Sequence, residues 1–160
     1  MLNQTNAMNT ETWVGNLIGK NTENKNVKIL FSIITVFLGS LLLIASAKIK
    51  VPLYPVPMTL QPLAVLMIAM LFGRKLATLT VGLYIFKGII GLPVFAFGGG
   101  LMYLMGPTGG FILGFFVSAL IVGYLADRGW GKKVPLSIIS MLIGMVIIYA
   151  LGIFQLSLLK

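Results

Sequence analysis

The feature that most constrains this chain is a series of long apolar runs without charge. The cleanest run, residues 29–47, has nineteen residues and is bounded by Lys28 and Lys48. A helix needs about 20 mainly apolar residues to cross the hydrocarbon core of a bilayer. Helices suit this task because all their backbone polar groups are satisfied within the segment. We therefore predict a membrane-spanning helix over residues 29–47.

Composition extends this interpretation to the whole chain. Hydrophobic residues make up 58% of the 160 residues and charged residues 9%, whereas a soluble domain carries about a quarter charged residues. So few charges cannot cover a globule of this size, so lipid must serve as solvent for the apolar faces. We predict an all-α, polytopic membrane helix bundle with five visible spans: 29–47, a second from Thr59 or Pro62 to 73, 76–91, 111–126 and 134–159.

The first 28 residues differ from the rest. They are polar and rich in Asn and Thr, a composition that cannot bury enough apolar surface to order itself. We predict a mobile N-terminal tail over 1–28, followed by one membrane-embedded domain over 29–160.

Two apolar segments interrupt the helical pattern. Four prolines fall within residues 51–62, and because proline blocks helix continuation we expect 51–58 to be ordered but non-helical. The segment 91–108 is apolar and rich in glycine, so it must pack against the protein or a ligand. Irregular backbone at membrane depth survives only when it is buried or lines a cavity. The sequence therefore predicts a binding site at these two loops.

The placement of Lys and Arg predicts the orientation, because cytoplasmic loops carry an excess of both. With the N-terminus in the cytoplasm of a cell (cytoplasmic) membrane, three basic residues lie at the outer side, Lys48, Lys50 and Lys87. The inner side then holds eight: Lys20, Lys25, Lys28, Arg74, Lys75, Arg128, Lys132 and Lys133. Both irregular loops fall on the outer face, so the predicted site opens to the exterior.

Several functional classes are disfavoured. The chain has no Cys, no His and three acidic residues, so thiol and imidazole chemistry, metal sites and carboxylate pairs have no basis. No nucleophile–base pair is visible, and we expect neither an enzyme nor a cofactor. The net charge of +9 does not indicate nucleic-acid binding, because the basic residues lie between apolar runs rather than on one face.

Polar and aromatic residues near the two loops are the candidate site. Gln61 offers both a donor and an acceptor, and Thr59 lies beside it, with helix capping as its alternative role. Lys87 stands within an apolar span, where charge is costly and usually functional; it would suit a carboxylate, or it snorkels to the interface. The other candidates are the aromatics Tyr84, Phe95 and Tyr103, which an interfacial belt would also explain, and Thr108 at a helix start.

Three ordered motifs resemble those of one family. Val-Pro-Met-Thr-Leu-Gln at 56–61 resembles the Pro-Val-Pro-x-Thr-Leu-Gln signature of BioY proteins, the biotin-binding S components of energy-coupling-factor (ECF) vitamin importers. Residues 88–96 are similar to that family's Gly-x-x-Gly-x-Pro-Val-Phe. Residues 106–111 are similar to its Gly-Pro-Thr-Gly-Gly-Tyr. The resemblance covers about 48–125.

The resemblance implies a six-helix bundle in membrane lipid that binds biotin near its outer face. It also implies docking on an ECF scaffold subunit that carries two ATPase subunits. Small residues on the first helix would form the docking face, with packing inside the chain as the alternative. By chemistry and position, Lys87 or amides near Thr108 would meet the biotin carboxylate. Thr59 and Gln61 would face the ureido group, and the aromatics would hold the rings.

The C-terminal part departs from the family pattern. Nothing here matches the sixth helix with its Gly-Asp-x-x-Lys-type motif, and the sequence ends at Lys160. On this ground we expect a truncated or fragmentary chain. The predicted function is biotin uptake as an S component; the alternatives are an S component for another vitamin and a membrane scaffold protein without a ligand.

Overall fold

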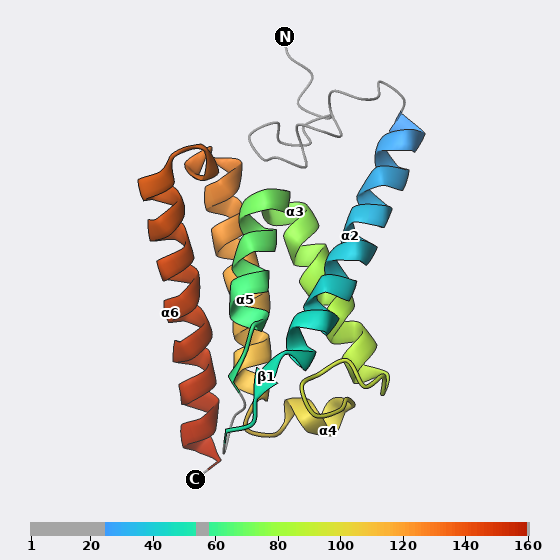
Figure 1. The fold of residues 1–160 in the computed structure, drawn as a ribbon, viewed down its shortest axis with the longest axis vertical. Helices are drawn as coiled ribbons and strands as arrows, with labels where there is room; N and C mark the ends of the chain where they lie inside the picture. The colour runs from blue at the N-terminus through green and yellow to red at the C-terminus, as the bar shows by residue number, and fades with distance from the viewer. Residues whose placement is uncertain (1–24, 54–57, 160) are drawn as a thin grey trace.

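Long helices dominate the computed structural model, which describes residues 25–53 and 58–159. Within these two ranges, four helices are long and apolar enough to cross a membrane: α2 (Lys25–Lys48), α3 (Gln61–Ile89), α5 (Gly109–Asp127) and α6 (Val134–Leu158). Figure 1 shows them as a bundle. The all-α membrane bundle is confirmed. The predicted tail lies outside the described residues up to residue 24, and α2 begins at Lys25, earlier than residue 29.

Helix α3 is broken at Gly73, whose φ of 84° and ψ of 174° are not helical. A side chain disfavours such a positive φ, so glycine suits this position. A straight helix would separate Gln61 from Tyr84 by about 35 Å, yet a hydrogen bond of 2.6 Å joins their side chains. The chain therefore reverses at Gly73 into two legs, 61–72 and 74–89 (Figure 1). These two legs correspond to the second and third predicted spans.

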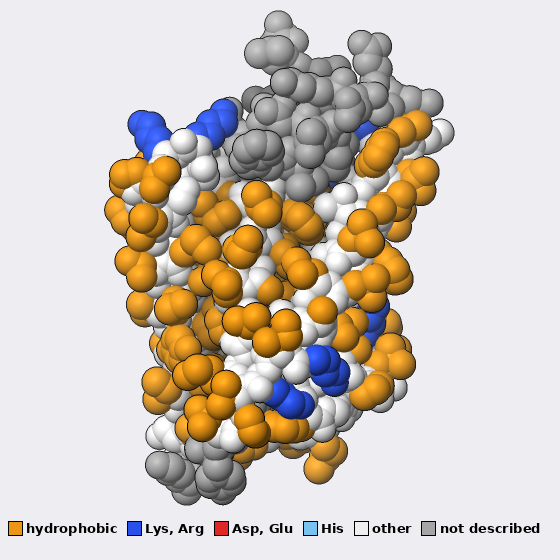
Figure 2. All heavy atoms as spheres, viewed as in Figure 1, with side chains coloured by type: hydrophobic (Ala, Val, Ile, Leu, Met, Phe, Trp, Pro, Cys, Tyr) orange, Lys and Arg blue, Asp and Glu red, His pale blue; other side chains and the backbone are white. Residues whose placement is uncertain are grey.

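The two legs of α3 form the centre of the bundle. Helix α2 packs on one side of α3, α5 packs on the other, and α6 packs mainly on α5. The buried core follows this order, with Leu43 from α2, Val65, Ile68 and Val81 from α3, Val122 from α5 and Ile148 from α6. Large apolar side chains on the outer faces of α2 and α6 stay exposed, and Figure 2 shows hydrophobic side chains along both sides of the bundle, where these two helices lie. Such a surface suits lipid rather than water.

The small residues of α2 pack within the chain. Ser40 and Ala47 are fully buried, and a Cβ on Gly39 would lie 2.7 Å from Thr80 Cγ2 of α3. Small residues allow such close approach of helices in lipid. The structure therefore supports packing within the chain, the alternative to a docking face, for these residues. Ala45 on the same helix is exposed.

The two irregular segments meet at one end of the bundle. Strand β1 (Lys50–Val51) pairs antiparallel with β2 (Met58–Thr59), and the loop 91–100 closes on itself through a bridge between Phe95 and Gly98. One turn of helix, α4 (Leu101–Leu104), lies within the segment expected to be non-helical. The turn at Gly73 and η2 (Trp130–Lys132) lie at the opposite end, with most of the described basic residues.

Candidate functional site

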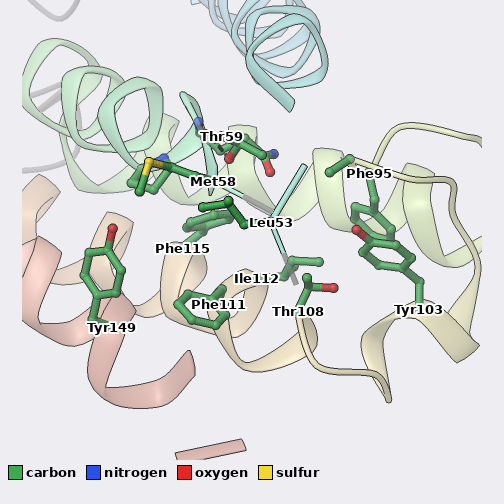
Figure 3. A pocket seen from close by; sticks show the side chains of 13 residues that line it. Leu53, Met58, Thr59, Phe95, Tyr103, Thr108, Phe111, Ile112, Phe115 and Tyr149 are labelled. Carbon is green, nitrogen blue, oxygen red and sulfur yellow. Dashed lines mark hydrogen bonds between the residues drawn. The ribbon is translucent and has the colours of Figure 1, made fainter. Parts of the chain in front are cut away.

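A cavity of about 200 Å³ opens where the two irregular segments meet. Its wall combines the β1–β2 hairpin, the start of α3, the 95–96 loop, α4 and the faces of α5 and α6 (Figure 3). None of the described lining residues is charged. They are Leu53, Met58, Thr59, Gln61, Pro62, Phe95, Ala96, Tyr103, Thr108, Phe111, Ile112, Phe115 and Tyr149.

Two consecutive hydrogen bonds fix the orientation of the Gln61 side-chain amide. The Tyr84 hydroxyl donates its proton to the Val94 carbonyl oxygen at 3.2 Å, so toward Gln61 it can only accept. The group 2.6 Å away is therefore the Gln61 Nε2 amide, which donates. Tyr84 is fully buried and does not line the cavity. One amide hydrogen and the Oε1 atom of Gln61 stay available to a ligand.

Thr59 combines two roles that the sequence left as alternatives. Its Oγ1 accepts a hydrogen bond from the Gln61 backbone N–H at 3.3 Å, at the first turn of α3. The same residue lines the cavity. The bond to the backbone at the start of α3 therefore does not remove Thr59 from the site.

Aromatic rings form one wall. Phe95 stacks on Tyr103, with centroids 5.0 Å apart and planes 21° apart, and its ring meets the buried Tyr84 edge-on at 5.5 Å. A Cβ on Gly88 would collide with the Phe95 ring. Glycine at position 88 therefore allows this ring to sit against α3.

The start of α5 forms another wall. Thr108 occupies the N-cap position but makes no capping hydrogen bond with its side chain, and it lines the cavity. The turn before it is tied to α6, because Gln155 Nε2 donates to the carbonyl oxygens of Leu104 at 3.0 Å and Gly106 at 2.7 Å. The position of Thr108 therefore depends on a contact from a distant helix.

Two lysines tie the loop 91–100 to the end of α2. Lys48 Nζ donates to the carbonyl oxygens of Pro93 and Phe95, each at 2.9 Å. Lys50 Nζ donates to the Ala96 carbonyl and lies 3.9 Å from the Phe97 ring centroid. Because Phe95 and Ala96 line the cavity, these lysines hold its wall without contacting its interior.

The structure thus brings five of the seven predicted residues to the cavity: Thr59, Gln61, Phe95, Tyr103 and Thr108. Tyr84 lies behind Gln61. Lys87 points away, because its Nζ donates to Ser40 Oγ of α2 at 2.9 Å and lies 4.6 Å from the Phe37 ring centroid. Lys87 therefore joins two helices and does not reach the cavity.

Sequence reasoning missed the contributions of α5 and α6. Phe111, Ile112 and Phe115 share one face of α5, and Tyr149 approaches from α6, with its ring edge-on to Phe111 at 6.0 Å. The sequence offered one indication of these residues: Phe111 and Ile112 directly follow the glycine-rich turn of the motif at 106–111, which resembles a family motif.

Comparison with known proteins gives consistent matches. The BioY family model matches residues 20–160. A biotin transporter BioY from Thermotoga maritima is 44% identical over 117 residues, which cover 72% of this chain and 68% of that protein. A probable biotin transporter BioY from Lysinibacillus sphaericus is 37% identical over 122 residues, which cover 76% of this chain and 62% of that protein. The chain thus spans about two thirds of the length of these relatives.

The fold also matches a solved structure. The crystal structure of the S component for biotin from an ECF-type ABC transporter superposes with a TM-score of 0.70 at 23% identity, covering 86% of this chain and 76% of that one. Together with four helices able to cross a bilayer, these matches describe a multi-pass membrane protein whose relatives are named transporters.

Proposed function

The chain belongs to the BioY family, and on this premise we propose that it binds biotin as the substrate-binding subunit of an ECF-type importer. The observation that carries the proposal is the uncharged cavity with one oriented amide, Gln61, at its wall. The ureido ring of biotin has two N–H donors and one carbonyl acceptor. Gln61 keeps an Oε1 acceptor and one N–H donor free after its bond to Tyr84, which is the complementary pair.

The remaining lining suits the other parts of biotin. Phe95 and Tyr103 offer stacked aromatic surface to the fused rings, and Thr59 adds a hydroxyl to the cavity wall. For the carboxylate we propose Thr108 at the start of α5, where a helix N-terminus favours negative charge. Lys87 does not line the cavity and its Nζ donates to Ser40 Oγ, which argues against this lysine as the carboxylate partner in this conformation.

We propose the orientation with the N-terminus in the cytoplasm. Arg74, Lys75, Arg128, Lys132 and Lys133 lie at turns opposite the cavity, and cytoplasmic loops carry the excess of basic residues. The cavity then opens to the exterior, as uptake requires. Energy would come from an ECF scaffold subunit with its ATPase subunits, because this chain offers no nucleotide-binding motif and no catalytic pair.

The proposal is tested by equilibrium binding of tritiated biotin to the purified full chain in detergent. We expect saturable binding and a biotin-dependent rise in thermal stability, about 2.7 kcal/mol at a hundredfold excess over Kd. Thr59→Val should weaken binding. Thr35→Val is the matched control, because Thr35 makes only a hydrogen bond to its own helix, at the exposed face of α2.

Competition separates the alternatives. If unlabelled thiamine or riboflavin displaces the label as well as biotin does, the substrate assignment fails. If no vitamin binds and none raises the melting temperature, the chain is a ligand-free membrane scaffold protein and the whole proposal is overturned.

A further inference from the structure

A second hollow lies on the lipid-facing side, away from the biotin cavity. It is an open groove of about 860 Å³ between α2 and the second leg of α3, and it shares no lining residue with the cavity. We call it the α2–α3 groove. Its lining is apolar except for Ser32, Lys75 and Thr78; the other members are Ile29, Ile33, Val36, Phe37, Leu76, Leu79, Gly82, Leu83, Phe86 and Phe116.

The polar members of the groove gather at one end. Lys75 and Thr78 are one helical turn apart at the start of the second leg of α3, and Ser32 lies on the facing part of α2. Lys75 is exposed, and no described carboxylate pairs with it. Beyond this end the groove continues over Leu79 and Phe86. A cation followed by a long apolar channel is complementary to an anionic amphiphile.

Thr78 provides an independent sign of a ligand. Its Oγ1 is buried without a hydrogen-bond partner among the described residues. A threonine in a helix usually bonds the carbonyl four residues earlier, as Thr80 does with Leu76 at 2.7 Å. A buried hydroxyl without a partner is unfavourable. An ester carbonyl one helical turn deeper than a headgroup would accept this proton.

The length of the groove matches one lipid leaflet. From Lys75 to Phe86 the helix rises about 16 Å at 1.5 Å per residue. One leaflet contributes about half of the roughly 30 Å hydrocarbon core. A single acyl chain would therefore fill the groove from the headgroup level to its deep end.

We propose that the α2–α3 groove binds one acyl chain of an anionic phospholipid. The phosphate lies against Lys75 and an ester carbonyl accepts the Thr78 hydroxyl proton. The chain runs along Leu79, Leu83 and Phe86. The positive charge of Lys75 at one end and the leaflet-length channel beyond it favour this occupant over the flat face of a protein helix.

The test uses the full chain, delipidated in detergent and titrated with phosphatidylglycerol or phosphatidylcholine of identical acyl chains. Native mass spectrometry counts bound lipid and thermal unfolding measures the stabilisation. We expect phosphatidylglycerol to bind at least tenfold more tightly than phosphatidylcholine. Lys75→Gln should abolish this difference, whereas Lys133→Gln, the same charge change at the same end but outside the groove, should keep it.

A second variant fills the groove without endangering the fold. A Cβ on Gly82 meets nothing nearer than Phe116 Cε2 at 3.7 Å, an ordinary contact, and leucine has a higher helix propensity than glycine. Gly82→Leu should therefore leave the chain folded, with biotin binding intact, and remove the bound lipid. Equal affinity for both lipids, an equal loss in Lys133→Gln, or an unchanged lipid response in Gly82→Leu would overturn the proposal. Loss of scaffold-subunit binding in Gly82→Leu, with lipid binding intact, would make the groove a protein interface instead.

Discussion

Removal of the Tyr84 hydroxyl oxygen tests the arrangement of the proposed biotin cavity most directly. Tyr84→Phe deletes the hydroxyl that accepts from Gln61 Nε2 at 2.6 Å and donates to the Val94 carbonyl at 3.2 Å. The ring stays, so its edge-on contact with Phe95 at 5.5 Å is retained. The substitution therefore removes two hydrogen bonds and leaves the packing unchanged.

The expected magnitude follows from these two bonds. A neutral hydrogen bond contributes about 1 kcal/mol net in proteins and about 0.6 kcal/mol between membrane helices. The free energy of unfolding should fall by about 1–2 kcal/mol. Once released, the Gln61 amide must be ordered by the ligand, and a cost of about 1.4 kcal/mol raises the Kd for biotin about tenfold.

The assay is a double-mutant cycle on the Kd for tritiated biotin, with thermal unfolding in parallel. If Tyr84 acts through Gln61, Tyr84→Phe should change the Kd less than about twofold in a Gln61→Met background, because no amide remains to be oriented. Tyr124→Phe removes the same hydroxyl from an exposed position on α5 and should leave the Kd unchanged. Additive effects of the two substitutions, or lower stability with an unchanged Kd, would refute the reasoning.

Three further substitutions probe the walls of the cavity. Lys48→Met loses both bonds to the carbonyls of Pro93 and Phe95 and should speed biotin release about fivefold in a chase experiment, because the loop is held less tightly. Gln155→Leu loses two bonds to the turn before α5 and should lower the free energy of unfolding by about 1–2 kcal/mol in thermal melts. Gly88→Ala places a methyl group against the Phe95 ring and should raise the Kd for biotin at least tenfold in equilibrium binding.

Matched variants control for charge and volume. Lys133→Met removes a lysine far from the loop and should not alter the release rate. Gly82→Ala adds the same methyl group where only an ordinary contact at 3.7 Å exists, and should leave the Kd unchanged. An equal effect of Gly82→Ala and Gly88→Ala on the Kd would contradict the packing argument. Unaltered unfolding of Gln155→Leu would show that the turn is held by other contacts.

The sequence predicted the spans well because the bilayer limits the choices. An apolar run of sufficient length has little alternative to a helix in lipid, and the basic residues at 74 and 75 marked the turn that the structure makes at Gly73. The prolines of 51–62 predicted irregular backbone, which the β1–β2 hairpin bears out for its described part. The short helix α4 was not foreseen, since Leu-Met-Tyr-Leu between two glycine-rich turns has no capping signal.

The site was predictable in part for a physical reason. Thr59, Gln61 and Thr108 stand out because polar side chains are rare in apolar segments. Phe115 and Tyr149 do not stand out, because apolar residues on a spanning helix look alike whether they face lipid or a cavity. Periodicity therefore identifies no inner face where both faces are apolar.

Lys87 is a polar residue for which the sequence also fails to show which way the side chain points. Its position in the chain gives its depth in the bundle, and the prediction of a functional intramembrane charge used that depth. Which neighbour it meets depends on the packing of α2, where Ser40 and Phe37 receive its ammonium group. Depth can be read from a sequence, whereas the azimuth around the helix axis follows from tertiary packing.

Among the described residues, most Ser and Thr hydroxyls bond a carbonyl of their own helix, whereas the Lys, Gln and Tyr side chains at the loop end join segments that are distant in the sequence. Lipid tails are as apolar as leucine, so burial of apolar surface does little to select one arrangement of helices in a bilayer. Hydrogen bonds and close packing at small residues then determine which arrangement of the helices is favoured. The long-range side-chain bonds at the loop end join separate segments: Lys48 to Pro93 and Phe95, Lys50 to Ala96, Gln61 to Tyr84, Tyr84 to Val94, and Gln155 to Leu104 and Gly106. These same contacts surround the cavity, so the bonds that stabilise the fold at this end also set the geometry of the proposed biotin site. A substitution in any of them should therefore change the stability of the chain and its affinity for biotin together.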